Sequence, residues 1–196
     1  MFIKLSRIVS VPVILAALIA LAAPAAAETA GYEVTPCQEN EKGRISTPLW
    51  VFVGDKDPAG LNVRSGPGTG YPVVKTIPTG RTAAVSITGS SGGWFHIDYV
   101  RICDEDKSFK SMELAGWVSG SLLQVRVIYE IDAPLFSEPR KDSTIVTKVP
   151  GGTLVTLSGC RCDSWCGWLE VRYEEFQGWI RPDHYREIVS LNFCDQ

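Results

Sequence analysis

The sequence predicts an all-β protein built from two small tandem β-barrels that follow an N-terminal export signal. Three observations support this prediction. One pattern of residues occurs twice, short strand-forming segments end at Gly or Pro, and no helical periodicity is present after the first 27 residues. This texture is typical of small barrels and sandwiches.

The repeated pattern indicates that one fold has been duplicated. Ser65 and Ser137 lie 72 residues apart, and Trp94 and Trp168 lie 74 apart. A spacing that drifts by two residues over a whole unit is the mark of an internal repeat. The first copy reads LNVRSGPG from Leu61, PTG at 78–80, GWFHIDY at 93–99 and GWV at 116–118; the second reads APLFSEPR from Ala133, PGG at 150–152, GWLEVRY at 167–173 and GWI at 178–180.

Residues 1–27 have the organisation of a secretory signal peptide. Lys4 and Arg7 precede an apolar run, and small residues at 25 and 27 form an Ala-x-Ala cleavage site. A retained membrane anchor is the alternative, because the run approaches the ~20 apolar residues that span a bilayer. Cleavage predicts an exported protein, periplasmic or extracellular, with no stable membrane insertion.

The remainder divides into four segments. We expect a loosely ordered lead segment at 28–48, a first barrel at 49–123, a second barrel at 124–189 and a C-terminal tail at 190–196. The linker around 119–124 is short, so the barrels should touch. The expected strands are 50–53, 61–63, 73–77, 82–88 and 94–100 in the first barrel, with a hairpin loop at 89–93, and 125–131, 135–136, 145–149, 153–157 and 168–173 in the second.

The first copy carries an insertion. Its two Trp residues are separated by 22 residues, against 10 in the second copy, and the excess falls mostly at 101–112. This stretch is charged and contains Cys103. It is predicted to be a tolerated surface loop, or alternatively a specificity loop held by Cys103.

The charge balance restricts the class of partner. After removal of the signal, 17 basic side chains face 22 acidic ones, a net charge of about −5. Nucleic acid is therefore not expected, because counterion release needs a basic surface. Attraction to an anionic lipid surface is also disfavoured, whereas neutral glycans and peptides remain compatible.

The six cysteines all follow the export signal, which favours disulfides. Six cysteines allow 15 pairings, so the pairing stays open. A bond between Cys160 and Cys166 across a hairpin tip is the first choice, and Cys37, Cys103 and Cys194 could tie down segments outside the repeat. A metal site on Cys160, Cys162 and Cys166 is the alternative, but it lacks a good fourth ligand. A redox-active dithiol is a further alternative, although no Cys-x-x-Cys opens a helix.

The LNVRSGPG string, the later Pro-x-Gly and the two Gly-Trp pairs resemble the bacterial Src-homology-3 (SH3b) family of cell-wall-associated domains. The likeness covers 50–123 and 125–187, and in the second copy it depends on Pro-Gly-Gly and the Gly-Trp pairs. The resemblance implies a strongly bent SH3-like β-barrel. It also implies peptidoglycan binding, or a targeting and interaction role.

In the strand that begins at the first Trp of each copy, alternate residues face opposite sides of the sheet, so core-facing and surface-facing residues can be told apart. Phe95, Ile97 and Tyr99 form an apolar set in the first copy, as do Leu169, Val171 and Tyr173 in the second. Each Trp falls with the polar set, where an indole can bind a sugar or peptide or can cover the barrel rim. The candidate ligand-binding residues are Trp94, His96, Trp117, Tyr71 and Arg64 in the first copy and Trp168, Arg172 and Trp179 in the second.

No pattern in the chain favours catalysis. The two histidines, His96 and His184, accompany no nucleophile elbow and no His-Glu-x-x-His, and the cysteines are more simply paired than reactive. The Gly-rich stretch 66–70 lacks the Lys-Ser/Thr of a phosphate-binding loop and is read as a turn. No cofactor or metal is expected.

Two functions follow from these patterns. The first is an exported, non-catalytic module that binds cell-wall peptidoglycan or its peptides through aromatic grooves. The second is an interaction protein that docks another envelope protein and has no affinity for the wall. The sequence does not separate them and does not indicate an oligomeric state.

Overall fold

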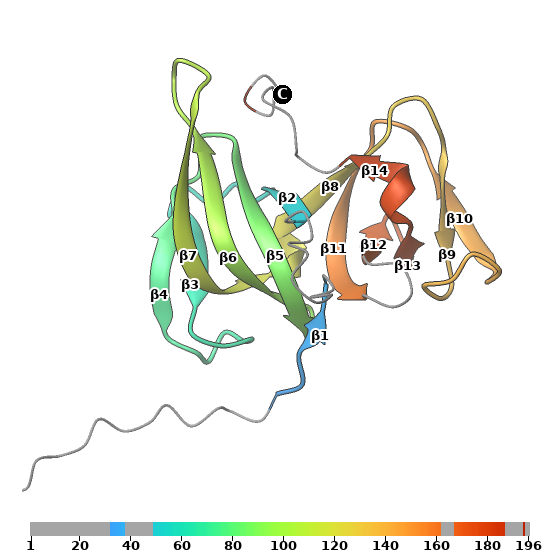
Figure 1. Ribbon diagram of the computed structural model, residues 1–196, viewed down its shortest axis with the longest axis horizontal. Coiled ribbons are helices and arrows are strands. Elements are labelled where there is room, and N and C mark those ends of the chain that lie inside the picture. Colours follow the sequence, from blue (N-terminus) through green and yellow to red (C-terminus); the bar gives the residue numbers. More distant parts are fainter. Residues whose placement is uncertain (1–31, 38–48, 162–166, 187–193, 195–196) are drawn as a thin grey trace, which may run out of the picture.

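The computed structural model describes residues 32–37, 49–161, 167–186 and 194 (Figure 1). Over these residues the chain is all-β, as predicted, with two short 3-10 turns and no α-helix. Within them, no helix has the length and apolarity needed to cross a bilayer. The expected export signal at 1–27 lies outside the described residues.

The strands fall into two groups, which we call the first unit (β2–β7) and the second unit (β8–β14). The first unit and the strand before it comprise β1 (Thr35–Pro36), β2 (Leu49–Val53), β3 (Leu61–Arg64), β4 (Val73–Ile77), β5 (Ala83–Ser91), β6 (Trp94–Cys103) and β7 (Phe109–Ser119). The turn η1 (Gly120–Leu122) leads to the second unit, which comprises β8 (Leu123–Val127), β9 (Ala133–Phe136), β10 (Ile145–Val149), β11 (Leu154–Arg161), β12 (Trp168–Tyr173), β13 (Phe176–Ile180), the turn η2 (Pro182–His184) and β14 (Tyr185–Arg186).

The two units repeat one strand order. The first runs β2-β5-β6-β7-β3-β4, and the second runs β8-β11-β12-β13-β9-β10. The lead strands β2 and β8 pair antiparallel, with Phe52 opposite Gln124, and so join both units into one path. The sheet ends at β4 and β10 and does not close on itself, so the two separate barrels expected from the sequence are two curled halves of one open sheet (Figure 1).

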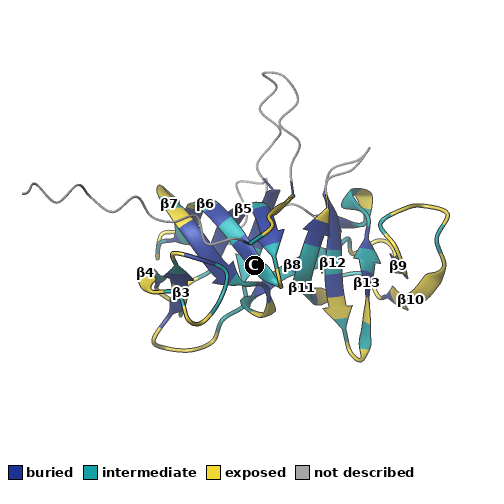
Figure 2. Cartoon of the chain, turned by 90° about the horizontal axis from the view of Figure 1, so that it is seen from below, coloured by how far each residue is buried: buried dark blue, intermediate teal, exposed yellow. Residues whose placement is uncertain are grey.

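The two units share one hydrophobic core. Val51 and Phe95 from the first unit belong to the same buried cluster as Leu123 and Leu169 from the second, and each of them is 0 % exposed. Exposed residues gather in the turns and along the outer strands (Figure 2). Burial of apolar side chains is the main stabilising term in folding, and most of it here lies in this shared cluster. A smaller cluster of Trp50, Ala84 and Cys103 belongs to the first unit alone.

The predicted alternation in β6 holds for its first half and then shifts. Phe95 and Ile97 are fully buried, but Tyr99 is 37 % exposed. The register against β7 slips between Ile97 and Tyr99, and after that irregularity Val100 points into the core instead. The prediction that Tyr99 is a core residue is therefore wrong, because a bulge reverses the face of every residue that follows it.

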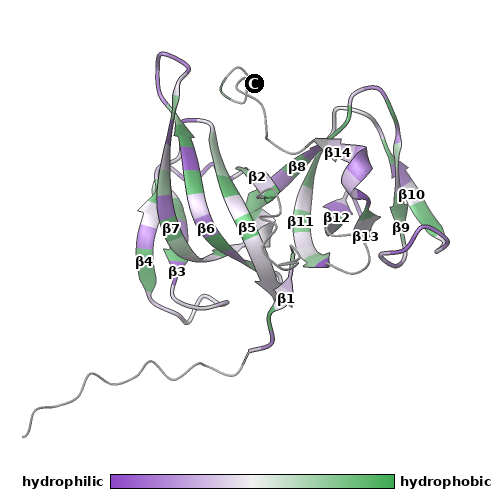
Figure 3. Cartoon of the chain, viewed as in Figure 1, coloured by the Kyte–Doolittle hydropathy of each residue, from purple (hydrophilic) through white to green (hydrophobic). Residues whose placement is uncertain are grey.

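The other predicted apolar set lies in β12. Leu169 and Val171 are fully buried, as predicted, and Tyr173 is half-buried against the core. The alternation of hydrophobic and hydrophilic residues along the strands is visible in Figure 3.

The insertion at 101–112 extends a hairpin and is not a loop. Pairing between β6 and β7 continues to Cys103, which lies opposite Phe109, so only residues 104–108 form the connection. Asp104 accepts ion pairs from Arg81 at 3.0 Å and from Lys110 at 2.9 Å. The expected hairpin loop at 89–93 is also shorter than predicted, because Ser91 still pairs with Trp94 and only Gly92 and Gly93 turn the chain.

Among the described residues two disulfides cross-link the chain, Cys37–Cys160 and Cys103–Cys194. The prediction that Cys160 pairs with Cys166 is wrong, since Cys160 is bonded to Cys37; Cys162 and Cys166 lie outside the described residues. The lead segment is held through Cys37, as predicted. The metal alternative loses Cys160 as a ligand, and in the described part of the chain no group of three His, Cys, Asp or Glu residues could hold a metal ion.

Candidate ligand-binding groove

Neighbouring strands of the first unit bring two of the candidate residues together. His96 in β6 lies directly opposite Trp117 in β7, so their side chains share one face of the sheet. The two rings meet edge to face, with centroids 5.3 Å apart and planes at 69°. This arrangement is a favourable one for aromatic pairs, and it fixes the orientation of both rings.

A third aromatic ring comes from the lead segment. Tyr32 packs edge-on against Trp117, with centroids 5.2 Å apart, and against Tyr71, at 6.2 Å. Trp117 is 4 % exposed. Sequence reasoning missed Tyr32. The available signal was an aromatic residue five positions before a cysteine in an otherwise polar segment.

His96, Trp117 and Tyr32 line a groove of about 930 Å³ on the surface of the first unit. Its other walls come from β4, β5 and β7, including Val74, Thr88 and Gly116. Among the described residues that line it, no side chain is an Asp, Glu, Lys or Arg. The groove therefore combines aromatic and aliphatic surface with a few neutral hydrogen-bonding groups, which is the composition typical of small-ligand sites.

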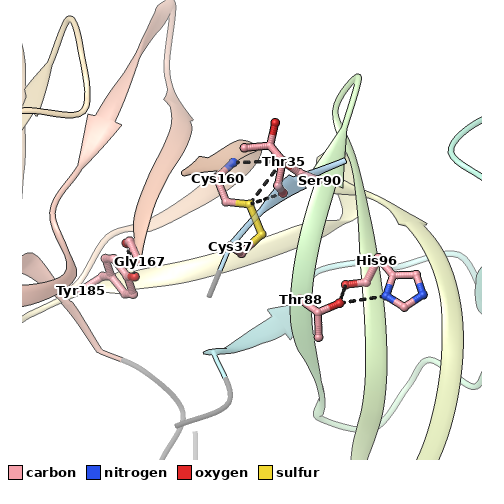
Figure 4. The surroundings of a disulfide bond; sticks show 8 residues. All are labelled: Thr35, Cys37, Thr88, Ser90, His96, Cys160, Gly167 and Tyr185. Carbon is pink, nitrogen blue, oxygen red and sulfur yellow. Dashed lines mark hydrogen bonds between the residues drawn. A yellow bond between two sulfur atoms is a disulfide. The ribbon is translucent and has the colours of Figure 1, made fainter. Parts of the chain in front are cut away.

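His96 is the one titratable imidazole in this groove lining. Burial lowers its pKa below the usual 6.5, and the nearby Asp98 carboxylate opposes that shift. The Thr88 hydroxyl lies 2.8 Å from His96 Nδ1 and 3.3 Å from the His96 carbonyl oxygen (Figure 4). His96 is thus neutral near pH 7. Its Nδ1 is hydrogen-bonded to the Thr88 hydroxyl, and this bond orients the ring.

Arg64 and Tyr71 belong to one loop at the edge of the groove. Arg64 Nη1 donates to the carbonyl oxygens of Thr69 at 3.1 Å and of Tyr71 at 2.7 Å. Arg64 also pairs with Trp117 through the backbone. In this structure its guanidinium stabilises the Gly-rich loop 65–70, which places Tyr71 against Tyr32.

Trp94 lies apart from this cluster. It is half-buried at the start of β6, where it pairs with Ser91 and Ser119, and the groove lining does not include it. The sequence groups Trp94 with His96 because both alternate onto the polar face of one strand. Two residues of separation along a strand, about 6.6 Å, are enough to place them at different parts of the surface.

The candidates of the second unit are arranged differently. Trp168 is 4 % exposed, so the prediction that it presents an indole to solvent is wrong. The ring of Phe136 covers it, with centroids 5.7 Å apart and planes at 84°. Trp179 is half-buried opposite Glu170, and Arg172 is exposed with its guanidinium 3.4 Å from the Gln177 amide oxygen.

The first unit is thus a curled set of strands that carries an aromatic surface groove. Residues 59–124 match the family model described as "Bacterial SH3 domain". The match covers β3 to β7 and the start of β8. The SH3 resemblance inferred from LNVRSGPG and the Gly-Trp pairs is therefore confirmed for the first unit.

The chain is also similar to a much longer curated protein. It is 29 % identical over 172 residues to the "Putative N-acetylmuramoyl-L-alanine amidase YrvJ" of Bacillus subtilis (strain 168). The match covers 79 % of this chain but 30 % of that protein, so the chain spans less than a third of the relative's length.

Two solved structures from Trichomonas vaginalis also match. They are titled as structures of NlpC2 and NlpC1, each 20 % identical to this chain and each covered over 49 % of its own length. The matches span 73 % and 78 % of this chain with a TM-score of 0.28, which supports no conclusion about the fold.

Proposed function

We propose that this protein is an exported, non-catalytic module that binds peptidoglycan or its peptides through the groove of the first unit. The observation that carries the proposal is the convergence of His96, Trp117 and Tyr32 on a groove whose lining has no ionised side chain. Such a groove favours an uncharged ligand segment, either a sugar face stacked on a ring or a short peptide.

The relatives support the same ligand class. The family model that residues 59–124 match is described as bacterial, and the curated relative is named as an N-acetylmuramoyl-L-alanine amidase. The signal-like residues 1–27 and two disulfides favour export.

A non-catalytic role is supported by the described cysteines. Cys37, Cys103, Cys160 and Cys194 are all in disulfides, so none of them supplies a thiolate nucleophile. The group in contact with His96 Nδ1 is the Thr88 hydroxyl, at 2.8 Å, and not a carboxylate. The arrangement suits a hydrogen bond to a ligand better than proton transfer.

The test is retention on purified peptidoglycan sacculi. Val74 lines the groove and is 52 % exposed, so Val74→Asp places a charge in an uncharged site without disturbing the core. Val146 is its counterpart in the second unit and is 39 % exposed, so Val146→Asp is the matched control. We expect Val74→Asp to reduce retention at least fivefold and Val146→Asp to leave it unchanged.

Two outcomes would contradict the proposal. Equal retention of Val74→Asp and wild type would remove the groove as the binding site. Absence of wild-type retention would remove the wall as the ligand and would favour the alternative from the sequence, docking of another envelope protein.

A further inference from the structure

The lead segment supplies one wall of the groove. Tyr32, Val34 and Pro36 line it from one side, and residues of β4 to β7 line it from the other. The groove stays open at about 930 Å³ with this segment in place. The segment therefore borders the groove and does not fill it, and a ligand in the groove would contact both the lead segment and the first unit.

This wall is attached through the second unit. Strand β1 pairs with β5 over only two residues, Thr35 opposite Ser90 and Pro36 opposite Gly89. The next residue, Cys37, is bonded to Cys160 in β11, which belongs to the second unit. Cys37 N–H also donates to the Thr88 carbonyl oxygen of β5 at 3.0 Å. Backbone pairing this short is weak alone, so the disulfide adds a covalent attachment to the segment.

The attachment point is buried where the two units meet. Cys37 is 0 % exposed and Cys160 is 3 % exposed. The hydroxyl of Ser90 in the first unit lies 3.2 Å from Cys160 Sγ and accepts a hydrogen bond from the Cys160 backbone N–H at 3.4 Å (Figure 4). These contacts fix Cys160 relative to β5, the strand that carries Thr88 of the groove.

We propose that Tyr32 is a specificity-determining residue of the groove, and that the second unit positions it through the Cys37–Cys160 bond. The inference rests on the proposed function, and it gives the second unit a role in binding that needs no groove of its own. The ligand it fits is an uncharged segment held between the Tyr32 ring and the surface formed by His96 and Val74. This role agrees with the burial of Trp168 beneath Phe136 in the second unit.

The first measurement compares four variants of the full mature chain, together with the combination of the first two, for retention on purified sacculi. Tyr32→Ala removes the wall ring, and Cys37→Ser with Cys160→Ser removes its attachment. Cys103→Ser with Cys194→Ser is the matched control, since it removes a disulfide that no groove residue shares. Tyr129→Ala, at a tyrosine 61 % exposed in the second unit, controls for loss of a surface ring.

We expect Tyr32→Ala and the Cys37/Cys160 variant each to weaken retention about tenfold, and their combination to weaken it no further. Both controls should bind like wild type. Retention that is unchanged or stronger in Tyr32→Ala, while Val74→Asp loses binding, would overturn the inference, because the lead segment would then be irrelevant or would block the groove.

The second measurement needs no ligand. The ¹⁹F resonance of 5-fluorotryptophan at position 117, assigned with Trp117→Phe, reports the packing of Tyr32 on that ring. We expect the Cys37/Cys160 variant to move this resonance to its position in Tyr32→Ala, and the Cys103/Cys194 variant to leave it unmoved. A resonance that stays at its wild-type position in the Cys37/Cys160 variant overturns the positioning role, even if sacculi prove not to be the ligand.

Discussion

Arg64 and Phe136 occupy the same position in the two units, but their side chains make different contacts. Each pairs through the backbone with the second Trp of its copy, Arg64 with Trp117 and Phe136 with Trp179. Arg64 turns its guanidinium to the carbonyls of the adjacent loop, where it supports Tyr71. Phe136 has no polar group to satisfy and packs on Trp168 instead. The same position thus supports a surface loop in the first unit and covers an indole in the second.

At the same scale, His96 predicts a pH dependence of stability. Its folded-state pKa lies below 6.5 because burial disfavours the imidazolium, so the unfolded chain binds more protons as the pH falls through 6.5. The stability that neutral His96 contributes is complete above about pH 6.5. It is lost progressively as the pH falls from there toward the lowered pKa.

His96→Gln should therefore flatten the decrease in Tm between pH 7 and pH 5, measured by circular dichroism. His184 has a pKa lowered chiefly by burial, so it adds a loss of the same sign and is removed by His184→Gln as a control. The contradicting outcome is a fall in Tm between pH 7 and pH 5 that is the same in wild type and His96→Gln, both with His184 present and in the His184→Gln background. It would show that His96 is not buried as a neutral ring.

At the scale of elements, the Gly-Trp pairs of the repeat have a steric origin. A Cβ on Gly116 would lie 2.9 Å from the Arg64 carbonyl oxygen and 2.5 Å from Val63 Cγ1, and one on Gly178 would lie 2.9 Å from the Phe136 carbonyl oxygen. Both glycines therefore allow the strand that carries the second Trp to approach β3 or its counterpart β9. The repeated Gly-Trp pair in the sequence therefore marks the place in each unit where these two strands lie close together.

We expect Gly116→Ala to destabilise the protein by about 1–3 kcal/mol, because a backbone oxygen cannot move away as a flexible side chain could. Gly70→Ala is the matched control: nothing lies within 4 Å of its added Cβ, so a change within about 0.5 kcal/mol is expected. Urea unfolding measures both. Equal free energies of unfolding for the two variants would refute the steric account of the motif.

Local patterns predicted the elements well and distant contacts poorly. The bounds predicted for β4, β10 and β12 agree with those observed, since each strand is delimited by Pro, Gly or Ser within a few residues of its ends. The partner of Cys160 lies 123 residues away in the chain, and nothing near Cys160 specifies it. The position of Tyr32 depends on that same bond.

The candidate site shows the same contrast between local patterns, which could be predicted, and distant contacts, which could not. Strand alternation placed His96 on the polar face, and the Gly-Trp motif singled out Trp117, so the sequence supplied two rings of the groove. It placed Trp168 wrongly, because alternation says which face a residue takes but not what covers that face. Phe136, 32 residues earlier in the chain, supplies the cover.

At the scale of the whole molecule, the two units should unfold together. Most of their buried residues form one shared cluster, β2 pairs with β8 across the junction, and the Cys37–Cys160 bond links the lead segment to the second unit. Differential scanning calorimetry should therefore give a single transition whose calorimetric and van 't Hoff enthalpies agree.

Removing the Cys103–Cys194 bond, which closes a loop of 91 residues, should lower stability by about 2–5 kcal/mol and keep one transition. Two resolved transitions in wild type, each with part of the enthalpy, would mean that the shared core does not couple the units, and that two independent domains describe the protein better than one open sheet.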